Sequence, residues 1–288
     1  MNLDTLHAQY LDTGYVLLPG ALPPADVQAL RDLTDRITAQ AHGLVEENAM
    51  FDFEAGHTPE APLVQRIKKP HRIDAHYFEL ARHPAIFGLV QKICGEHMRL
   101  SHSKINMKAA GAGSPLEWHQ DWAFAPHSNM STVVASVMID DVSADNGPMQ
   151  VLPGSHRGRL YEHHDPELGF VGAVDLQAEG VDLAGAVSLT GTAGTVALHH
   201  PMLMHGSSAN HSGRSRRILF LEYAAADAYP LFYTVDWDEY NSRLLNGAPT
   251  SQVRTEPSVI KLPFPSRAGS SIYKAQAHAR ARHFGQAA

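Results

Sequence analysis

The sequence is poor in cysteine: its 288 residues include one, Cys94. A single cysteine excludes an intrachain disulfide and a cysteine-rich zinc cluster, and it is typical of proteins kept in a reducing compartment. The chain also lacks a run of ~18 to 20 apolar residues, and its start lacks a basic stretch followed by an apolar core. We therefore expect a cytoplasmic protein with no membrane span and no membrane partner.

Positive charge is also in short supply. The 23 Lys and Arg residues are outnumbered by 30 Asp and Glu residues, which gives a net charge of −7. This balance disfavours a broad contact with a phosphate backbone, so we expect no nucleic-acid partner. With 44% hydrophobic residues, the chain can bury a large core without disulfides, and we expect one domain over residues 1–288. The sequence carries no signal that sets the oligomeric state.

Hydrophobic periodicity predicts helices first and strands afterwards. Apolar residues at helical spacing predict helices over residues 24–37 and 84–95, and a strand is expected at 15–20. Alternating or β-branched stretches predict further strands at 100–108, 132–139, 149–152, 195–200 and 215–223. Many short strands separated by turns indicate a mainly β fold, a sandwich or barrel with helical cover. We place a helical and loop N-terminal part at about 1–97, a β core at about 98–225 and a C-terminal extension at about 226–288.

Two segments are expected to be loops. Residues 43–70 are polar, irregular and contain prolines, which predicts a surface loop or flap of the kind that often carries substrate contacts. Residues 157–185 predict a loop-rich insertion. At the end of the first segment stands a basic cluster, whose members are Lys68, Lys69, His71 and Arg72. Charge runs are usually solvated loops, and the alternative is a patch that recruits an anionic substrate.

Histidine is the residue in excess, with 19 copies. His119 and Asp121 stand two residues apart, directly after a Gly/Pro-rich turn. On an extended strand such residues point to the same face, so together they could bind one metal ion. A second histidine from elsewhere would complete the two-histidine, one-carboxylate set of a non-haem iron oxygenase. Chance predicts roughly one such pair at this composition, and His163 and Asp165 form another, which we discount because no predicted strand flanks it.

Residues downstream give the first pair its weight. His205 follows a predicted buried strand and is succeeded by Gly206 and Ser207, and Arg216 lies on the next predicted strand. A bidentate guanidinium with a nearby hydroxyl is the natural clamp for the far carboxylate of a keto acid. His205 is therefore our candidate for the third metal ligand.

Three other histidines compete with His205 for that position. His199 stands on the same predicted strand, and His200 precedes a proline there, which favours a place in the core or behind a ligand. His211 lies in a predicted turn and is expected to be exposed.

A larger set of motifs agrees in order and spacing with a known family. Its members are Trp118-His119-Gln120-Asp121, Asn146-Gly147-Pro148-Met149, Pro153-Gly154-Ser155-His156, His205-Gly206-Ser207 and Arg216. Over about residues 10–225 this pattern resembles the phytanoyl-CoA dioxygenase family of Fe(II)/2-oxoglutarate oxygenases. The resemblance implies a double-stranded β-helix (jelly-roll, cupin-like) core.

The same resemblance implies the roles of individual residues. Fe(II) would be held by His119, Asp121 and His205, and 2-oxoglutarate by Arg216 and Ser207. Likeness to the ectoine-hydroxylase branch adds two residues to the co-substrate pocket, Asn106 and His102, although a glutamine would be expected at position 102. Halogenating relatives carry a small residue at the carboxylate position, so Asp121 favours hydroxylation.

The expected function is a dioxygenase that uses O2 and 2-oxoglutarate as co-substrates. It would hydroxylate a C–H bond of a small, anionic metabolite and release succinate and CO2. A metal-dependent hydrolase or isomerase on the same jelly roll is an alternative that would need neither Arg216 nor O2. A non-catalytic ligand-binding protein is a third possibility, and it would consume no 2-oxoglutarate.

Overall fold

Two antiparallel sheets form the centre of the molecule. The structure, a computed structural model, describes residues 2–265 and 271–285. The larger sheet has the strand order β1-β11-β6-β13-β4-β3-β2, with β14 also paired to β4, and the smaller has the order β10-β7-β12-β5. The strands are β1 (Tyr15–Leu18), β2 (Phe51–Phe53), β3 (Val64–Lys68), β4 (Met98–Lys108), β5 (Leu116–His119), β6 (Thr132–Met138), β7 (Met149–Val151), β8 (His164–Asp165), β9 (Gly169–Phe170), β10 (Val187–Leu189), β11 (Val196–His199), β12 (His205–Ser207), β13 (Arg216–Ala225) and β14 (Leu244–Asn246).

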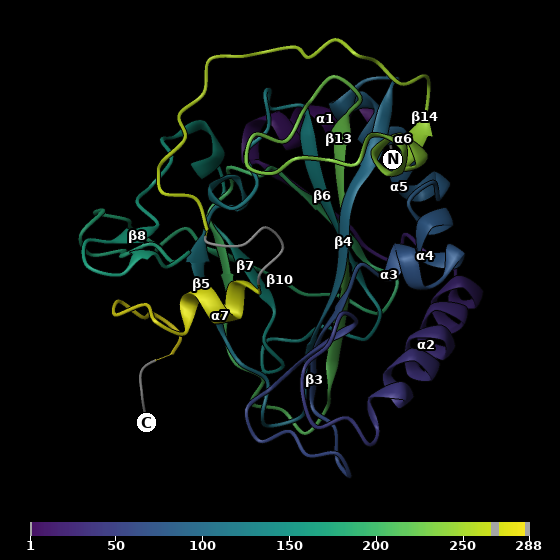
Figure 1. The fold of residues 1–288 in the computed structure, drawn as a ribbon, viewed down its shortest axis with the longest axis vertical. Coiled ribbons are helices and arrows are strands. Elements are labelled where there is room, and N and C mark those ends of the chain that lie inside the picture. The colour runs from purple at the N-terminus through teal and green to yellow at the C-terminus, as the bar shows by residue number, and fades with distance from the viewer. Residues whose placement is uncertain (1, 266–270, 286–288) are drawn as a thin grey trace.

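Helices cover the outer face of the larger sheet. In Figure 1, α2 to α5 lie to the right of this sheet, and the smaller sheet with α7 lies to its left. The α-helices are α1 (Leu3–Thr13), α2 (Pro24–Thr38), α3 (Pro70–Ile73), α4 (Ala75–Leu80), α5 (Pro84–Cys94), α6 (Trp237–Ser242) and α7 (Ile272–Gln276), and the 3-10 turns are η1 (Ala39–Ala41), η2 (Asp121–Ala123) and η3 (Ser155–Arg157). None of these helices, within the described residues, is long and apolar enough to cross a membrane.

The alternation of β4 and β13 separates a hydrophobic core from a polar interior. Leu219 and Leu221 of β13 and Ile105 of β4 are fully buried in the main core, together with Leu30 of α2 and Leu89 of α5. Successive side chains of a strand point to opposite faces, so the residues between them point toward the smaller sheet. The polar residues there belong to a site between the sheets, and the packed core behind holds them in place.

The register of β4 and β13 sets neighbours on that inner face. Arg216 of β13 is paired with Lys108 of β4, and Ile218 is paired with Asn106. Residues opposite one another in an antiparallel pair have side chains on the same face. The interior of the barrel therefore carries two cationic side chains side by side at one end.

Most of the predicted strands and helices are present, and one prediction is wrong. Residues 43–70 are not a surface loop, because they contain β2 and β3, which extend the larger sheet beyond β4. Their polar pattern hides the strands: Asp52 and Arg66 are both buried and form an ion pair with Nε 2.7 Å from Oδ2. The insertion at 157–185 is loop-rich as predicted, with a short β8–β9 hairpin.

Candidate metal and co-substrate site

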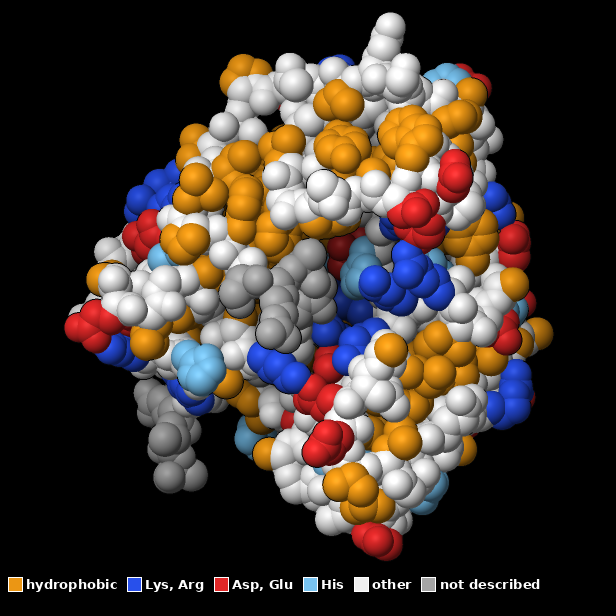
Figure 2. Space-filling view, in the orientation of Figure 1, with side chains coloured by type: hydrophobic (Ala, Val, Ile, Leu, Met, Phe, Trp, Pro, Cys, Tyr) orange, Lys and Arg blue, Asp and Glu red, His pale blue; other side chains and the backbone are white. Residues whose placement is uncertain are grey.

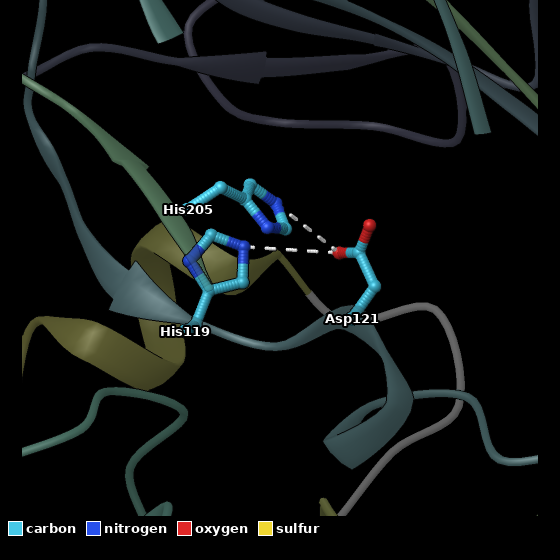
Figure 3. A group of neighbouring side chains, drawn as sticks. All are labelled: His119, Asp121 and His205. Carbon is cyan, nitrogen blue, oxygen red and sulfur yellow. Dashed lines mark ion pairs between the residues drawn. The ribbon is translucent and has the colours of Figure 1, made fainter. Parts of the chain in front are cut away.

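Three side chains meet between the two sheets. His119 ends β5, Asp121 begins the 3-10 turn η2, and His205 begins β12 directly opposite His119 in the register. Figure 3 shows both rings directed at the carboxylate, and one donor atom of each residue lies within 4.8 Å of the other two. Asp121 Oδ1 is 3.7 Å from Nε2 of His119 and 3.8 Å from Nε2 of His205.

Backbone carbonyls orient both imidazole rings. Nδ1 of His119 lies 2.7 Å from the carbonyl oxygen of Glu117, and Nδ1 of His205 lies 2.8 Å from that of Leu203. A carbonyl can only accept, so Nδ1 carries the proton and Nε2 presents its lone pair to the centre. Burial lowers the pKa of both rings, that of His205 to about 4, which keeps them in the neutral form that binds metals.

A histidine on the larger sheet forms a hydrogen bond with the carboxylate of Asp121. Nε2 of His199, on β11, lies 3.2 Å from Oδ2, the oxygen that does not face the other two ligands. Burial of Asp121 opposes ionisation, but His205, the hydrogen bond from His199 and the charge of Lys104 outweigh it, and its pKa lies well below the ordinary value. The group is therefore an anion at neutral pH.

The residue between the two ligands is anchored away from the centre. The Gln120 amide donates to the carbonyls of Met202 and Arg159 at 2.9 and 3.2 Å, and its Oε1 accepts from the Tyr161 backbone at 2.8 Å. Its backbone N–H donates to Nε2 of His163 at 2.9 Å. The chain from His119 to Asp121 is thus fixed at its midpoint, which keeps both ligands on one side.

This donor set fits a non-haem iron. Two neutral imidazoles and one carboxylate on one face of an ion leave further coordination positions open, the arrangement used by Fe(II) oxygenases. Within residues 2–265 and 271–285, these three side chains are the group whose ligand atoms lie close enough together to hold one metal ion. The predicted residues His119, Asp121 and His205 are brought together.

A second group of side chains closes the inner end of the same cavity. Arg216 is 3% exposed, and burial lowers its pKa to about 10. One of its terminal nitrogens donates to the Gly147 carbonyl, whereas its Nε meets no hydrogen-bond acceptor in the part of the chain that the structure describes. Ser207 Oγ accepts from Nζ of Lys108 at 2.9 Å. Burial and the neighbouring Arg216 hold the Lys108 pKa well below the usual range.

Of the remaining two predicted co-substrate residues, one lines the cavity. The walls of the cavity include Asn106, Ser207, Arg216 and the three candidate ligands. Oδ1 of Asn106 is buried and finds no partner among the described side chains and backbone. His102 lies four residues before Asn106 on β4, opposite Glu222, and is not among the lining residues.

Lys108 was missed by sequence reasoning, although a signal was present. It stands two residues after Asn106 on the same strand, so period-two alternation places it on the same inner face. Its side chain therefore lies beside that of Arg216, which lines the cavity. A buried guanidinium is suited to neutralise a buried carboxylate, and Lys108 holds the Ser207 hydroxyl next to it.

The competing histidines lie elsewhere. His199 contacts Asp121 from behind, as described above. The His200 ring packs with its centroid 5.9 Å from that of Tyr10, and its Nδ1 accepts from the Met202 backbone. His211 is exposed, and His163 accepts from the Gln120 backbone.

Comparisons with known proteins agree with this geometry. A family model described as phytanoyl-CoA dioxygenase matches residues 10–218. The chain is 36% identical to a probable alpha-ketoglutarate-dependent hypophosphite dioxygenase of Stutzerimonas stutzeri, a match that covers 93% of this chain and 95% of the relative. It is 30% identical to L-proline trans-4-hydroxylase of Streptomyces griseoviridis, over 75% of this chain and 84% of the relative.

Solved structures confirm the fold. The crystal structure of EctD from S. alaskensis with bound Fe superposes with a TM-score of 0.68 at 24% identity, covering 90% of this chain and 89% of that one. The predicted double-stranded β-helix (jelly-roll, cupin-like) core is thereby confirmed. The chain belongs to the phytanoyl-CoA dioxygenase family and is a non-haem Fe(II)- and 2-oxoglutarate-dependent dioxygenase.

Proposed function

We propose that this dioxygenase hydroxylates a small anion, a phosphinate or phosphonate in the first instance, with its metal on His119, Asp121 and His205. The observation that carries the assignment is the shared cavity of that ligand set and Arg216. A hydrolase or a sensor would need the metal ligands alone, whereas 2-oxoglutarate needs a buried cation a few ångströms away. A cytoplasmic location is part of the proposal, in keeping with the buried, unpaired Cys94.

Each end of 2-oxoglutarate has a match in the cavity. Its keto-acid end would face the two imidazoles and the carboxylate, where bound Fe(II) supplies the site of O2 activation. Its far carboxylate would meet Arg216, whose Nε is an unpartnered donor in the described residues, and the hydroxyl of Ser207. One oxygen atom of O2 enters the substrate as hydroxyl and the other enters succinate, with loss of CO2.

The basic cluster divides into three residues whose side chains have partners and one lysine without an ion pair. Lys68 Nζ lies 2.8 Å from Oδ1 of Asp52. Arg72 is paired with Glu239. Nδ1 of His71 is 2.5 Å from the Ser103 hydroxyl, and burial lowers the pKa of this ring to about 3. Lys69 makes no ion pair within 4 Å in the described part of the chain, so it retains charge for a ligand.

Lys69 also has an unusual backbone. Its φ is 48°, and in residues 2–265 and 271–285 it is the one non-glycine residue with positive φ. Such strain is often found at functional sites, where the surrounding structure maintains it. Burial is the main cause of the lowered pKa of His71 and His102. The positive charge of Lys69 lowers both further, and that of Lys104 also lowers the pKa of His102. Lys104 lines the cavity. Figure 2 shows Lys and Arg side chains beside a hollow in the face of the molecule that is turned toward the viewer. Similarity to the probable hypophosphite dioxygenase makes a phosphorus oxyanion the favoured occupant.

Steady-state turnover tests the proposal. Succinate formation is measured with 2-oxoglutarate, Fe(II) and O2 against hypophosphite, methylphosphonate and L-proline. We expect succinate coupled to product with one of the two phosphorus anions and none with proline. Coupled turnover of proline alone, or turnover that continues without O2, would contradict the proposal.

Lys69→Asn isolates the substrate contact, because asparagine tolerates a left-handed backbone but carries no charge. Losing one charge-assisted hydrogen bond is expected to raise KM roughly ten- to hundredfold. Lys68→Ala is the matched control, since Lys68 already forms an ion pair with Asp52. Equal KM changes in both variants would refute the role of Lys69.

A further inference from the structure

Residues 271–285, here called the C-terminal strap, cover the inner end of the cavity. They lie beyond residues 10–218, the part of the chain that the family model matches. α7 of the strap lies against β5, the strand that ends in His119 (Figure 1). Ile272 and Tyr273 line the cavity together with Ser207 and Arg216. The family model stops at residue 218, so the core described by the family does not contain this wall.

One glutamine pairs with the exposed edge of the smaller sheet. β5 is the last strand in the order of that sheet, so one side of it has no strand partner. Gln276 fills the place: its Oε1 accepts from the Glu117 N–H at 2.8 Å, and its Nε2 donates to the Glu117 carbonyl at 3.2 Å. Nε2 also donates to the Gly172 carbonyl at 2.8 Å. Edge groups that would otherwise be open are thus satisfied by the strap.

The side chain of Glu117 fixes the end of the strap. Its carboxylate accepts three successive backbone N–H groups, from His283 at 2.7 Å, Phe284 at 3.0 Å and Gly285 at 2.8 Å. The Phe284 ring stacks on that of Trp118, with centroids 6.0 Å apart and planes at 19°. Hydrogen bonds to a carboxylate are stronger than those between neutral groups. The strap is therefore docked at both ends on the strand that carries an iron ligand.

The hydroxyl of Tyr273 has no partner in this arrangement. The residue is 8% exposed, and its oxygen is buried with no hydrogen-bond partner in the described residues, as is Nε of Arg216. Leaving such groups unsatisfied costs about 1–3 kcal/mol each, so their coincidence in one cavity indicates a missing ligand. Burial raises the Tyr273 pKa, and the hydroxyl remains a donor at neutral pH.

The missing ligand should be an anion with acceptor oxygens. Arg216 supplies buried positive charge at this end, and the carboxylate of Glu54, whose charge acts on Tyr273, is already hydrogen-bonded to Gln65 and Ser114. We propose that Tyr273 donates its hydroxyl to the far carboxylate of 2-oxoglutarate, so that the strap forms part of the co-substrate site. This inference rests on the proposed function.

The contacts link co-substrate binding to docking of the strap. The Glu117 carbonyl accepts from both Nδ1 of His119 and Nε2 of Gln276. A bound 2-oxoglutarate that contacts Tyr273 stabilises the docked strap, and by reciprocity the docked strap strengthens 2-oxoglutarate binding. Deletion of the hydroxyl should weaken both together.

The test compares Tyr273→Phe with Lys274→Ala. Lys274 is the next residue, and it points outward to an ion pair with Glu47 at the surface. The 2-oxoglutarate Kd is measured by anaerobic titration of Fe(II)-loaded protein, and hydrogen exchange of residues 271–285 is followed with and without 2-oxoglutarate. We expect Tyr273→Phe to weaken binding roughly ten- to hundredfold and to remove most of the exchange protection that 2-oxoglutarate confers. Lys274→Ala should change neither.

The outcomes separate this proposal from the function on which it rests. If Tyr273→Phe binds 2-oxoglutarate as wild type does, while Arg216→Ala does not, the strap proposal is wrong and the proposed function stands. If 2-oxoglutarate binds to the wild-type protein but leaves the hydrogen exchange of residues 271–285 unchanged, the link between co-substrate binding and strap docking is also wrong. If wild-type protein fails to bind 2-oxoglutarate, both fall. Gln276→Ala gives a second variant: it keeps the hydroxyl but weakens docking, and it should raise the Kd and the exchange rate together.

Discussion

Replacement of Arg216 by alanine removes the charge expected to anchor 2-oxoglutarate. The guanidinium is 3% exposed and has an unpartnered Nε in the described part of the cavity, so an incoming carboxylate would form a buried, hydrogen-bonded ion pair with it. Removing one partner of such a pair costs about 3–5 kcal/mol. At about 1.4 kcal/mol per tenfold change, the 2-oxoglutarate Kd should rise by a factor of roughly a hundred to a few thousand.

Lys108 determines where in that range the result falls. Its Nζ donates to Ser207 Oγ at 2.9 Å. Besides burial, the charge of Arg216 lowers the Lys108 pKa, so the loss of Arg216 favours protonation of Lys108 beside the carboxylate. We therefore expect the lower end, about a hundredfold. Arg216→Lys should fall between wild type and alanine, because an ammonium retains charge but cannot make a bidentate contact.

The assay is an anaerobic titration with 2-oxoglutarate of protein already loaded with Fe(II). Iron affinity, measured separately, should stay the same, since Arg216 does not contact the metal ligands. Arg214→Ala is the control: it lies just before the same strand, with a side chain 66% exposed. A Kd for Arg216→Ala within about threefold of wild type would refute the anchoring role.

Two further predictions concern the metal and the stability. His199→Phe removes the hydrogen bond to Asp121 Oδ2 and should weaken Co(II) or Fe(II) binding to the apoprotein by about 10- to 100-fold. His199→Gln, whose side chain can still donate a hydrogen bond, should recover part of the lost affinity. Equal metal affinities in the wild type and both variants would show that the hydrogen bond does not position the carboxylate. Burial lowers the pKa of His71 to about 3 and of His102 to about 4, so the unfolded chain, with histidine near 6.5, binds more protons. The free energy of unfolding in urea should therefore fall as pH drops from about 6.5 toward 4; a flat or rising profile would contradict the buried, neutral state of these rings.

The metal ligands and the co-substrate anchor were predictable because local rules determine them. His119 and Asp121 are two residues apart at the end of a strand, and Gln120 has extended φ and ψ of −121° and 128°, which keeps both on one side. His205 and Arg216 follow from the strand pattern and from the family resemblance. Period-two alternation on β4 would also have identified Lys108.

The remaining features depend on contacts between distant parts of the chain. The sequence does not predict β2 and β3 because buried side chains in them are charged, and the Asp52–Arg66 ion pair that permits this burial forms only on folding. The basic cluster could not be divided from sequence, since the partner of Arg72 is Glu239, 167 residues away. Tyr273 reaches the cavity through the docking of Gln276 on Glu117, which no periodicity indicates.

The most direct test of the central claim is the absorption spectrum of the anaerobic protein with Fe(II) and 2-oxoglutarate. A weak visible charge-transfer band should appear in wild type, since it requires both to be bound at one centre. His119→Ala and Asp121→Ala should abolish the band. A band that survives both substitutions would contradict the ligand set His119, Asp121 and His205.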